Sequence, residues 1–297
     1  MKKNSALFIL MLMCLIAFDA CDKINAPYRE EFIINDFCAT GIEDSMIHRK
    51  VLVEDFTGHL CGRCPAGGVY LNDSLKQLYD HCLVVISIHA GFFATLCPNG
   101  LACPGGQPGG SFTTDFNTVA GTDWYNFFDM TTNPNALINR IDYPAGSHSK
   151  SVSAWASTIS NQLSTKADAK ITIENAYSGS IRSIHITIKT NFLSNLTGNY
   201  KLQVVLTEDS IIDWQEWYLH TPLYVPDYNH RHVMRAAINS SWGELIASGP
   251  VSIGDALTKT YDYTIPNNWN ADHCNVVAFV YNDLTKEVLQ VEEQSVK

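Results

Sequence analysis

The sequence predicts two folded parts, an α/β domain with a long inserted loop followed by an antiparallel β-sandwich. Two observations support this fold class. Between residues 51 and 89, two apolar strands flank a helical pattern, which is the arrangement of a parallel β-α-β unit. After residue 168, alternating polar and apolar runs follow one another with turns and no helical pattern between them. We therefore predict an α/β domain over residues 48–167 and a β-sandwich over 168–297.

An export signal occupies residues 1–20. Two lysines precede the apolar run Ala6–Phe18, which is too short to span a bilayer. Cys21 follows a small residue at the place where bacterial lipoproteins are processed, so we expect a lipid on Cys21 and a tether over residues 21–47. The residues just before Cys21 depart from the usual lipoprotein pattern, so secretion without lipid stays the alternative. Either route leads to a compartment where disulfides persist.

Composition narrows the classes of partner. The formal net charge is −10, which argues against a nucleic-acid partner. No second apolar run reaches membrane-spanning length, so we expect membrane attachment only through the N-terminal lipid. We expect no cofactor. After Cys21 the number of cysteines is odd, so at least one is free or paired with another chain.

The segment Val51–Pro65 (VLVEDFTGHLCGRCP) carries the most specific signal in the chain. It predicts a strand over 51–57, a short turn and a Cys-x-x-Cys pair at a helix start. Free backbone N–H groups at that end of the helix favour a thiolate on Cys61, and Arg63 adds a cation. A thiolate is the species that attacks disulfides. Cys64 falls on the stripe that faces the sheet, so we predict an exposed attacking Cys61 and a sheltered resolving Cys64.

This strand and CxxC pair resemble the thioredoxin superfamily. The resemblance implies that Asp55, six residues before Cys61, assists proton transfer to the resolving thiol. In the segment TTNPNALINR, Pro134 opens a later apolar strand and matches the cis-proline of that fold. Asn133 and Pro134 would then present backbone groups to a substrate peptide. The alternative is an ordinary proline at the start of a strand.

The rest of the first domain is predicted from local pattern. We expect a helix over 62–80, a buried strand over 83–89 and a closing helix over 151–166. Residues 91–121 form an insertion rich in Gly, Pro and Cys, which a Cys97–Cys103 disulfide would stabilise. These two cysteines with the CxxC pair could instead suggest zinc, but their spacing is wider than zinc sites use, so we expect no metal.

The second domain is predicted as a sandwich of immunoglobulin-like size. An aromatic excursion over 210–248 interrupts it and contains His230 and His232. These could ligate a metal together with His220, but no acidic or cysteine ligand is spaced alongside, so hydrogen-bonded histidines are the preferred interpretation. We expect the aromatic residues to pack between the domains rather than form a sugar or haem platform. The predicted strands are 170–176, 183–192, 200–208, 259–265, 275–282 and 287–292.

The whole chain after the signal resembles the Omp28-type outer-membrane lipoproteins. The matching stretches are VLVEDFTGHLCGRCPAG, NPNALINR and YNHRHVMRAA. The resemblance implies a lipid-anchored protein of the outer membrane, facing the periplasm or the cell surface, and it implies little about activity.

Two functions therefore stay open. The first is thiol–disulfide exchange on exported proteins, with Cys61, Cys64, Asp55 and Pro134 at the site. The second is a non-enzymatic surface binding protein or adhesin that uses the same fold as a scaffold for an external ligand. The pairing of Cys38, Cys82 and Cys274 is left open.

Overall fold

Two parallel strands form the centre of the largest sheet. The structure is a computed structural model that describes residues 47–97 and 109–297; the predicted signal, the lipid site Cys21 and most of the tether lie outside the described residues. Strands β1 (Val51–Thr57) and β2 (Leu83–His89) pair in parallel along their whole lengths. Every residue of β2 is buried, as expected for a strand covered on both faces. Their bounds agree with the sequence prediction.

A helical crossover connects β1 to β2. The helix predicted over 62–80 is present as α2 (Cys64–Tyr70), a π-helical turn η1 (Leu71–Leu75) and α3 (Lys76–Tyr79), followed by the short 3-10 turn η2 (Asp80–Cys82). Leu71 and Leu75 are buried, so this crossover packs one face on the sheet.

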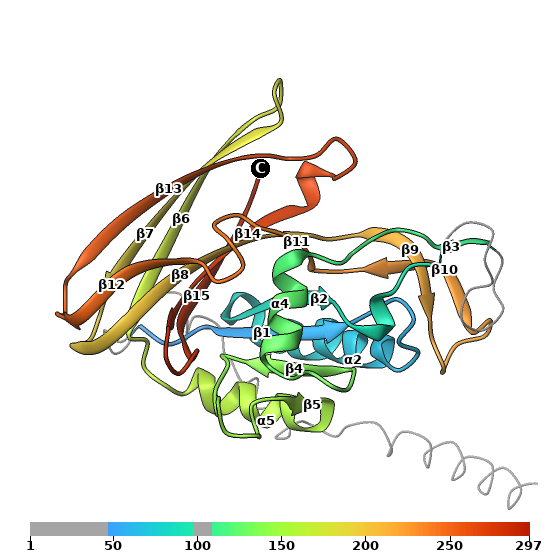
Figure 1. The fold of residues 1–297 in the computed structure, drawn as a ribbon, viewed down its shortest axis with the longest axis horizontal. Helices are drawn as coiled ribbons and strands as arrows, with labels where there is room; N and C mark the ends of the chain where they lie inside the picture. Colours follow the sequence, from blue (N-terminus) through green and yellow to red (C-terminus); the bar gives the residue numbers. More distant parts are fainter. Residues whose placement is uncertain (1–46, 98–108) are drawn as a thin grey trace, which may run out of the picture. The chain divides into compact units, whose positions relative to one another are not determined.

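The central pair belongs to a nine-stranded sheet. Within the described residues, its order is β15-β14-β8-β11-β2-β1-β4-β5, and β12 also pairs with β8 (Figure 1). The contact between β11 and β2 is parallel and short, centred on Val233 and Ser87. The further strands are β4 (Asn135–Ile138), β5 (Lys150–Ser151), β8 (Leu196–Glu208), β11 (Val233–Ala237), β12 (Glu244–Val251), β14 (Cys274–Asn282) and β15 (Val288–Ser295).

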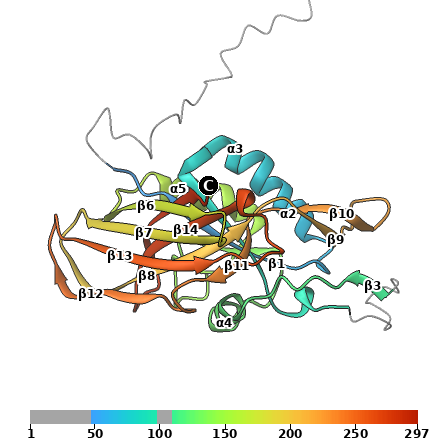
Figure 2. The same ribbon diagram turned by 90° about the horizontal axis from the view of Figure 1, so that it is seen from above.

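Helices lie on both faces of this sheet. Helix α4 (Val119–Phe127) lies on the face opposite α2 and α3 (Figure 2). Its buried Trp124 shares a core with Leu52 of β1 and Phe279 of β14. Helix α5 (Val152–Leu163) confirms the predicted closing helix and buries Trp155, Ile159 and Leu163. The insertion contributes the short elements η3 (Phe92–Ala94) and β3 (Gly109–Phe112).

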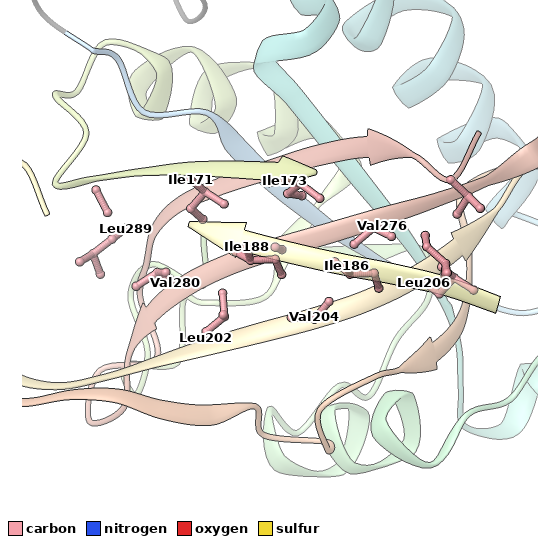
Figure 3. Close-up of a cluster of buried hydrophobic side chains, with 14 of the residues drawn as sticks. Ile171, Ile173, Ile186, Ile188, Leu202, Val204, Leu206, Val276, Val280 and Leu289 are labelled. Carbon is pink, nitrogen blue, oxygen red and sulfur yellow. The ribbon is translucent and has the colours of Figure 1, made fainter. Parts of the chain in front are cut away.

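A second, three-stranded antiparallel sheet packs on the far part of the first. It consists of β6 (Ala169–Ser178), β7 (Ser183–Phe192) and β13 (Ala256–Thr264), in the order β13-β7-β6. Alternate residues of β6 and β7 are buried, which gives one apolar face. Figure 3 shows Ile186 and Ile188 of this face against Leu202 and Val276 of the larger sheet. The short turn η4 (Ala271–His273) precedes β14.

The second half of the chain is therefore β-rich and two-layered, as the alternating runs predict. The aromatic excursion is not a loop. It contains a separate two-stranded hairpin, β9 (Ile211–Glu216) and β10 (Tyr224–His230), and it then supplies β11 and β12 to the larger sheet.

Strands from both sides of residue 167 share the nine-stranded sheet. The described residues all lie within one compact unit, and one core joins Val84 and Ile86 of β2 with Val205 of β8 and Val277 of β14. The division into domains at 167/168 stays a prediction about folding units. A buried ion pair, in which Arg140 Nε donates to Glu54 Oε2 at 2.8 Å, lies in the same core.

Candidate functional site

The CxxC pair lies where the sequence places it, at the start of the crossover helix. Cys61 and Cys64 are joined by a disulfide, and α2 begins at Cys64 with Pro65 in its first turn. Proline is tolerated there because its missing N–H would have no partner in the helix. Arg63 immediately precedes the helix, and its side chain is exposed.

The predicted exposure of Cys61 is wrong. Cys61 is 2% exposed and Cys64 is 5% exposed, so both cysteines are buried. The reason is a long-range contact, since the β9–β10 hairpin covers the loop that carries Cys61. The ring of Tyr218 lies so close over Gly62 that a Cβ on this residue would be 2.1 Å from it.

Backbone hydrogen bonds hold the hairpin on the loop. The Glu216 N–H donates to the His59 carbonyl and the Tyr218 N–H to the Gly62 carbonyl, each at 2.8 Å. Gln215 is 2% exposed, and its amide group donates to the Cys61 carbonyl at 3.2 Å. A segment from the second half of the chain thus binds the CxxC loop as an added strand would.

Asp55 shares a cavity with Cys64. Both residues line a cavity of about 270 Å³ between β1, α2 and the β9–β10 hairpin. Asp55 is 4% exposed, and burial raises the pKa of its carboxyl group to about 7. The structure therefore brings together two of the predicted site residues, while their roles in proton transfer stay a prediction.

Asn133 and Pro134 lie on another side of α2. The peptide bond between them is cis, as the sequence comparison with the thioredoxin superfamily implied. Pro134 lies against Gly67, and its Cβ is 3.3 Å from the position that a Cβ on Gly67 would occupy. Neither residue lines the cavity that Asp55 and Cys64 share. Substrate binding by this dipeptide stays a prediction.

Histidines and aromatic residues complete the cavity, and sequence reasoning did not assign them to this site. His89 ends β2 opposite Thr57 in the register, so it lies at the carboxyl edge of the two parallel strands, where ligands commonly bind. Burial lowers the pKa of His89, and it lowers that of His230 to about 4, so both rings are neutral at pH 7. Tyr228 and Trp217 contribute from the hairpin side. The strand-end position of His89 is the one signal that could have identified it.

The three histidines considered as metal ligands, His220, His230 and His232, do not lie together in the structure. His230 lines the cavity, His232 lies beside Asp209, and exposed His220 stacks on Trp217. Among the described residues, no group of three or more His, Cys, Asp or Glu side chains is placed to hold a metal ion. Much of the aromatic excursion packs inside the molecule: Trp214 and Tyr224 contact Phe112.

The remaining cysteines are partly assigned. Cys82 and Cys97 are each disulfide-bonded. Cys38 and Cys103 lie outside the described residues, so the Cys97–Cys103 pairing stays a prediction. Cys274 is a free, buried thiol, and burial raises its pKa to about 12.

These features define a class of protein. It is a β-rich chain with a buried CxxC disulfide, and the β9–β10 hairpin from its second half covers the loop that carries Cys61. The chain belongs to the Omp28 family, because the sequence profile described as "Outer membrane protein Omp28" matches residues 122–297. This places the protein in the cell envelope, at the outer membrane. The match begins within α4, so the CxxC motif precedes the matched residues.

Solved structures give further similarities. A crystallised domain of the outer membrane lipoprotein Omp28 from Porphyromonas gingivalis is 23% identical, with 44% of this chain and 89% of that domain covered and a TM-score of 0.31. A β-glucuronidase of Bacteroides uniformis is 10% identical, with 42% of this chain and 12% of that one covered and a TM-score of 0.22. The sporulation control protein Spo0M of Bacillus subtilis is 12% identical, with 43% and 48% covered and a TM-score of 0.24. Similarities with such low TM-scores say nothing about the chemistry of this chain.

No curated protein matches the sequence. In the part of the chain that the structure describes, none of the helices combines the length and the apolar character that crossing a membrane requires.

Proposed function

We propose that this outer-membrane protein performs thiol–disulfide exchange at Cys61 and Cys64, within a thioredoxin-like module made of β1, β2, β4 and the crossover helix. A lipid on Cys21 would anchor it to the membrane. One observation carries the proposal: Asp55 and Cys64 line the same cavity, and burial raises the pKa of the Asp55 carboxyl group to about 7. Such a group is able both to take and to give a proton at neutral pH, which exchange at a thiol requires.

The chemistry follows from the residues present. Reduction of the disulfide forms two thiolates, and each takes up a proton or stays charged. In this proposal the protonated Asp55 carboxyl group supplies a proton to Cys64 as its bond to Cys61 breaks, and the carboxylate removes that proton when the bond forms again; the cavity that both residues line supports this role. The two histidines that line the cavity, His89 and His230, are neutral at pH 7 and add no positive charge to it.

The test is a redox titration of the purified chain without its signal. The protein is equilibrated in mixtures of oxidised and reduced dithiothreitol, the thiols are alkylated, and residues 61 and 64 are quantified by mass spectrometry. We expect reversible exchange in the folded state. Asp55→Asn should slow exchange by roughly tenfold or more, whereas Asp262→Asn, an exposed substitution on β13, should not. A folded protein that keeps the disulfide in strongly reducing mixtures would refute the proposal.

One observation favours a second function, that of a binding scaffold with a structural disulfide. Both cysteines are buried, and the hairpin is hydrogen-bonded over the loop that carries Cys61. A disulfide in this position ties the start of α2 to the loop after β1 without any need for turnover. In that case the exposed surfaces would bind an external partner, and the titration above would leave the disulfide intact.

A further inference from the structure

The cavity beside Cys64 contains buried polar atoms that are not hydrogen-bonded. Asp55 Oδ1, both ring nitrogens of His89, Asn72 Oδ1 and Trp217 Nε1 have no hydrogen-bond partner among the described residues. All four residues line the same cavity. Because a buried polar atom without a hydrogen-bond partner destabilises the folded state, several of them around one space indicate a site built for a polar molecule.

The two sulfurs differ in their access to this space. Cys64 lines the cavity, and Cys61 does not. Cys61 instead lies in the loop under the hairpin, where the side-chain amide of Gln215 donates to the carbonyl of Cys61 itself and the backbone N–H of Tyr218 donates to that of Gly62. A molecule in the cavity therefore meets Cys64, whereas Cys61 is 2% exposed and lies outside the cavity lining.

The same hairpin limits the size of the substrate. A polypeptide substrate that pairs with the CxxC loop as an added strand needs free backbone groups there, and here β9 and the residues after it already bind the carbonyl groups of His59 and Gly62. The cavity, of about 270 Å³, is at the lower limit for small-molecule pockets, which are roughly 300–1,000 Å³. It suits a molecule of amino-acid to small-peptide size.

We propose that the site takes low-molecular-weight thiols and disulfides of amino-acid type, and that exchange begins at the sulfur of Cys64 instead of Cys61. The unpartnered atoms of Asp55, His89, Asn72 and Trp217 bind the amino and carboxyl groups of the small molecule. This inference rests on the proposed function, and it changes both the substrate class and the order of the sulfurs predicted from the sequence.

Each step balances in atoms and electrons. The thiolate of a first small thiol forms a bond to Cys64 Sγ, the bond between Cys64 and Cys61 breaks, and Cys61 leaves as a thiolate that takes up a proton. A second small thiolate attacks the sulfur of the first in the mixed disulfide and releases the Cys64 thiolate, which takes a proton from Asp55. Two small thiols are thereby oxidised to one small disulfide, and the protein disulfide is reduced to two thiols.

The test compares two single-thiol variants. Cys61→Ser leaves Cys64 as the thiol, and Cys64→Ser leaves Cys61. Each folded variant is mixed with cystine, and formation of the mixed disulfide is followed by mass spectrometry. We expect Cys61→Ser to react at least tenfold faster than Cys64→Ser. In urea, where the cavity is absent, the two rates should become similar. Faster reaction of the folded Cys64→Ser variant, or equal folded rates, would overturn the inference.

A measurement on the unsubstituted protein covers the case in which a variant fails to fold. The reduced protein receives a short pulse of iodoacetamide in the folded state, and the labelled residue is mapped. Predominant labelling of Cys64 supports the inference, and predominant labelling of Cys61 refutes it. Insulin serves as the protein-sized disulfide: capture of insulin by folded Cys61→Ser as fast as capture of cystine would refute the size limit. If the pair exchanges reversibly but through Cys61, the proposed function stands and only this inference fails.

Discussion

Two adjacent carboxyl groups on β1 have opposite environments, although both are buried. Glu54 accepts two hydrogen bonds from the guanidinium group of Arg140, which also lies over the rings of Trp124 and Phe279. Asp55 points to the other face, and no such cation neutralises it among the described residues. The ion pair of Glu54 with Arg140 is therefore part of the core, whereas a charged Asp55 is disfavoured because burial removes its hydration.

The environment of Asp55 predicts a pH-dependent stability. The pKa of its carboxyl group is about 7 in the folded protein, above its ordinary value of 3.8. Between these values the folded state holds a proton that the unfolded state has lost, so the free energy of unfolding falls as the pH rises from about 4 to 7. The full effect is on the order of 4 kcal/mol. We expect Asp55→Asn to remove this decline, which denaturant unfolding of both proteins at several pH values would measure.

The pH dependence of the stability of the unsubstituted protein is not due to Asp55 alone, because His89 and His230 also titrate, so the Asp55→Asn variant is needed for comparison. Burial lowers the pKa values of His89 and of His230 below the ordinary 6.5, so their contribution to the free energy of unfolding rises with pH up to about 6.5, over most of the same range. Both proteins carry these histidines, and the difference between their stability curves isolates Asp55. Parallel curves would mean that Asp55 titrates normally and would weaken its proposed role in proton transfer.

At the scale of elements, the β9–β10 hairpin is the segment that determines access to the disulfide. Its closest approach is at Gly62, where the ring of Tyr218 occupies the space that any side chain would need. The backbone N–H of Tyr218 donates a hydrogen bond to the Gly62 carbonyl, so protection of this amide from hydrogen exchange reports whether the hairpin is closed.

Gly62→Ala should open this contact. The added methyl group would lie 2.1 Å from the Tyr218 ring, so the ring has to move towards solvent, and hydrogen exchange of the Tyr218 amide should become faster by tenfold or more. In the double variant with Tyr218→Ala, the methyl group has room and much of the protection should return. Gly146→Ala is the matched control, because no atom lies within 4 Å of its added Cβ. Unchanged exchange in Gly62→Ala would show that the hairpin does not close on the loop in solution.

The sequence predicts the local part of this arrangement and misses the long-range part. β1 and β2 have the predicted bounds because continuous apolar runs bounded by polar turns indicate a buried parallel strand on their own. The position of Cys64 at the start of a helix follows in the same way from Pro65 and from Leu71 and Leu75, which recur at helical spacing.

No local sequence pattern predicts that the β9–β10 hairpin covers Cys61. This covering depends on Gln215 and Tyr218, which lie about 150 residues later in the chain, and on hydrogen bonds of the backbone, which are the same for every sequence. The cavity was missed for a similar reason: His89 is close in sequence to the motif, but Trp217, Tyr228 and His230 reach it only through the fold of the hairpin.

At the scale of the whole molecule, both halves contribute to one core. The face of the large sheet that α4 covers contains Phe56 and Ile86 from the first half and Met234 and Phe279 from the second. Removing the second half would expose the apolar side of β2 and α4, so we do not expect residues 47–167 to keep this structure alone.

We expect the described chain to unfold in a single transition. Ile86 in the shared core and Ile186 between the two sheets are both fully buried, and truncating either to Ala should cost about 2–5 kcal/mol. Because the halves are joined, each substitution should lower the same midpoint, whether unfolding is followed by hydrogen exchange of the β2 amides or by loss of β-sheet circular dichroism. Exchange of the β2 amides that Ile186→Ala leaves unchanged would show independent units and support the boundary near Ala167.

The origin of the hairpin has a consequence for how the protein matures. A chain that is exported from its N-terminal end delivers Cys61 and Cys64 to the oxidising side of the inner membrane well before Gln215 follows, since the two regions are separated by about 150 residues. The disulfide can thus be introduced by the oxidising enzymes of that compartment while the loop is still uncovered. Arrival of the hairpin then covers Cys61 and leaves Cys64 lining the cavity, so the newly translocated chain and the finished protein present the two cysteines to different sets of reagents.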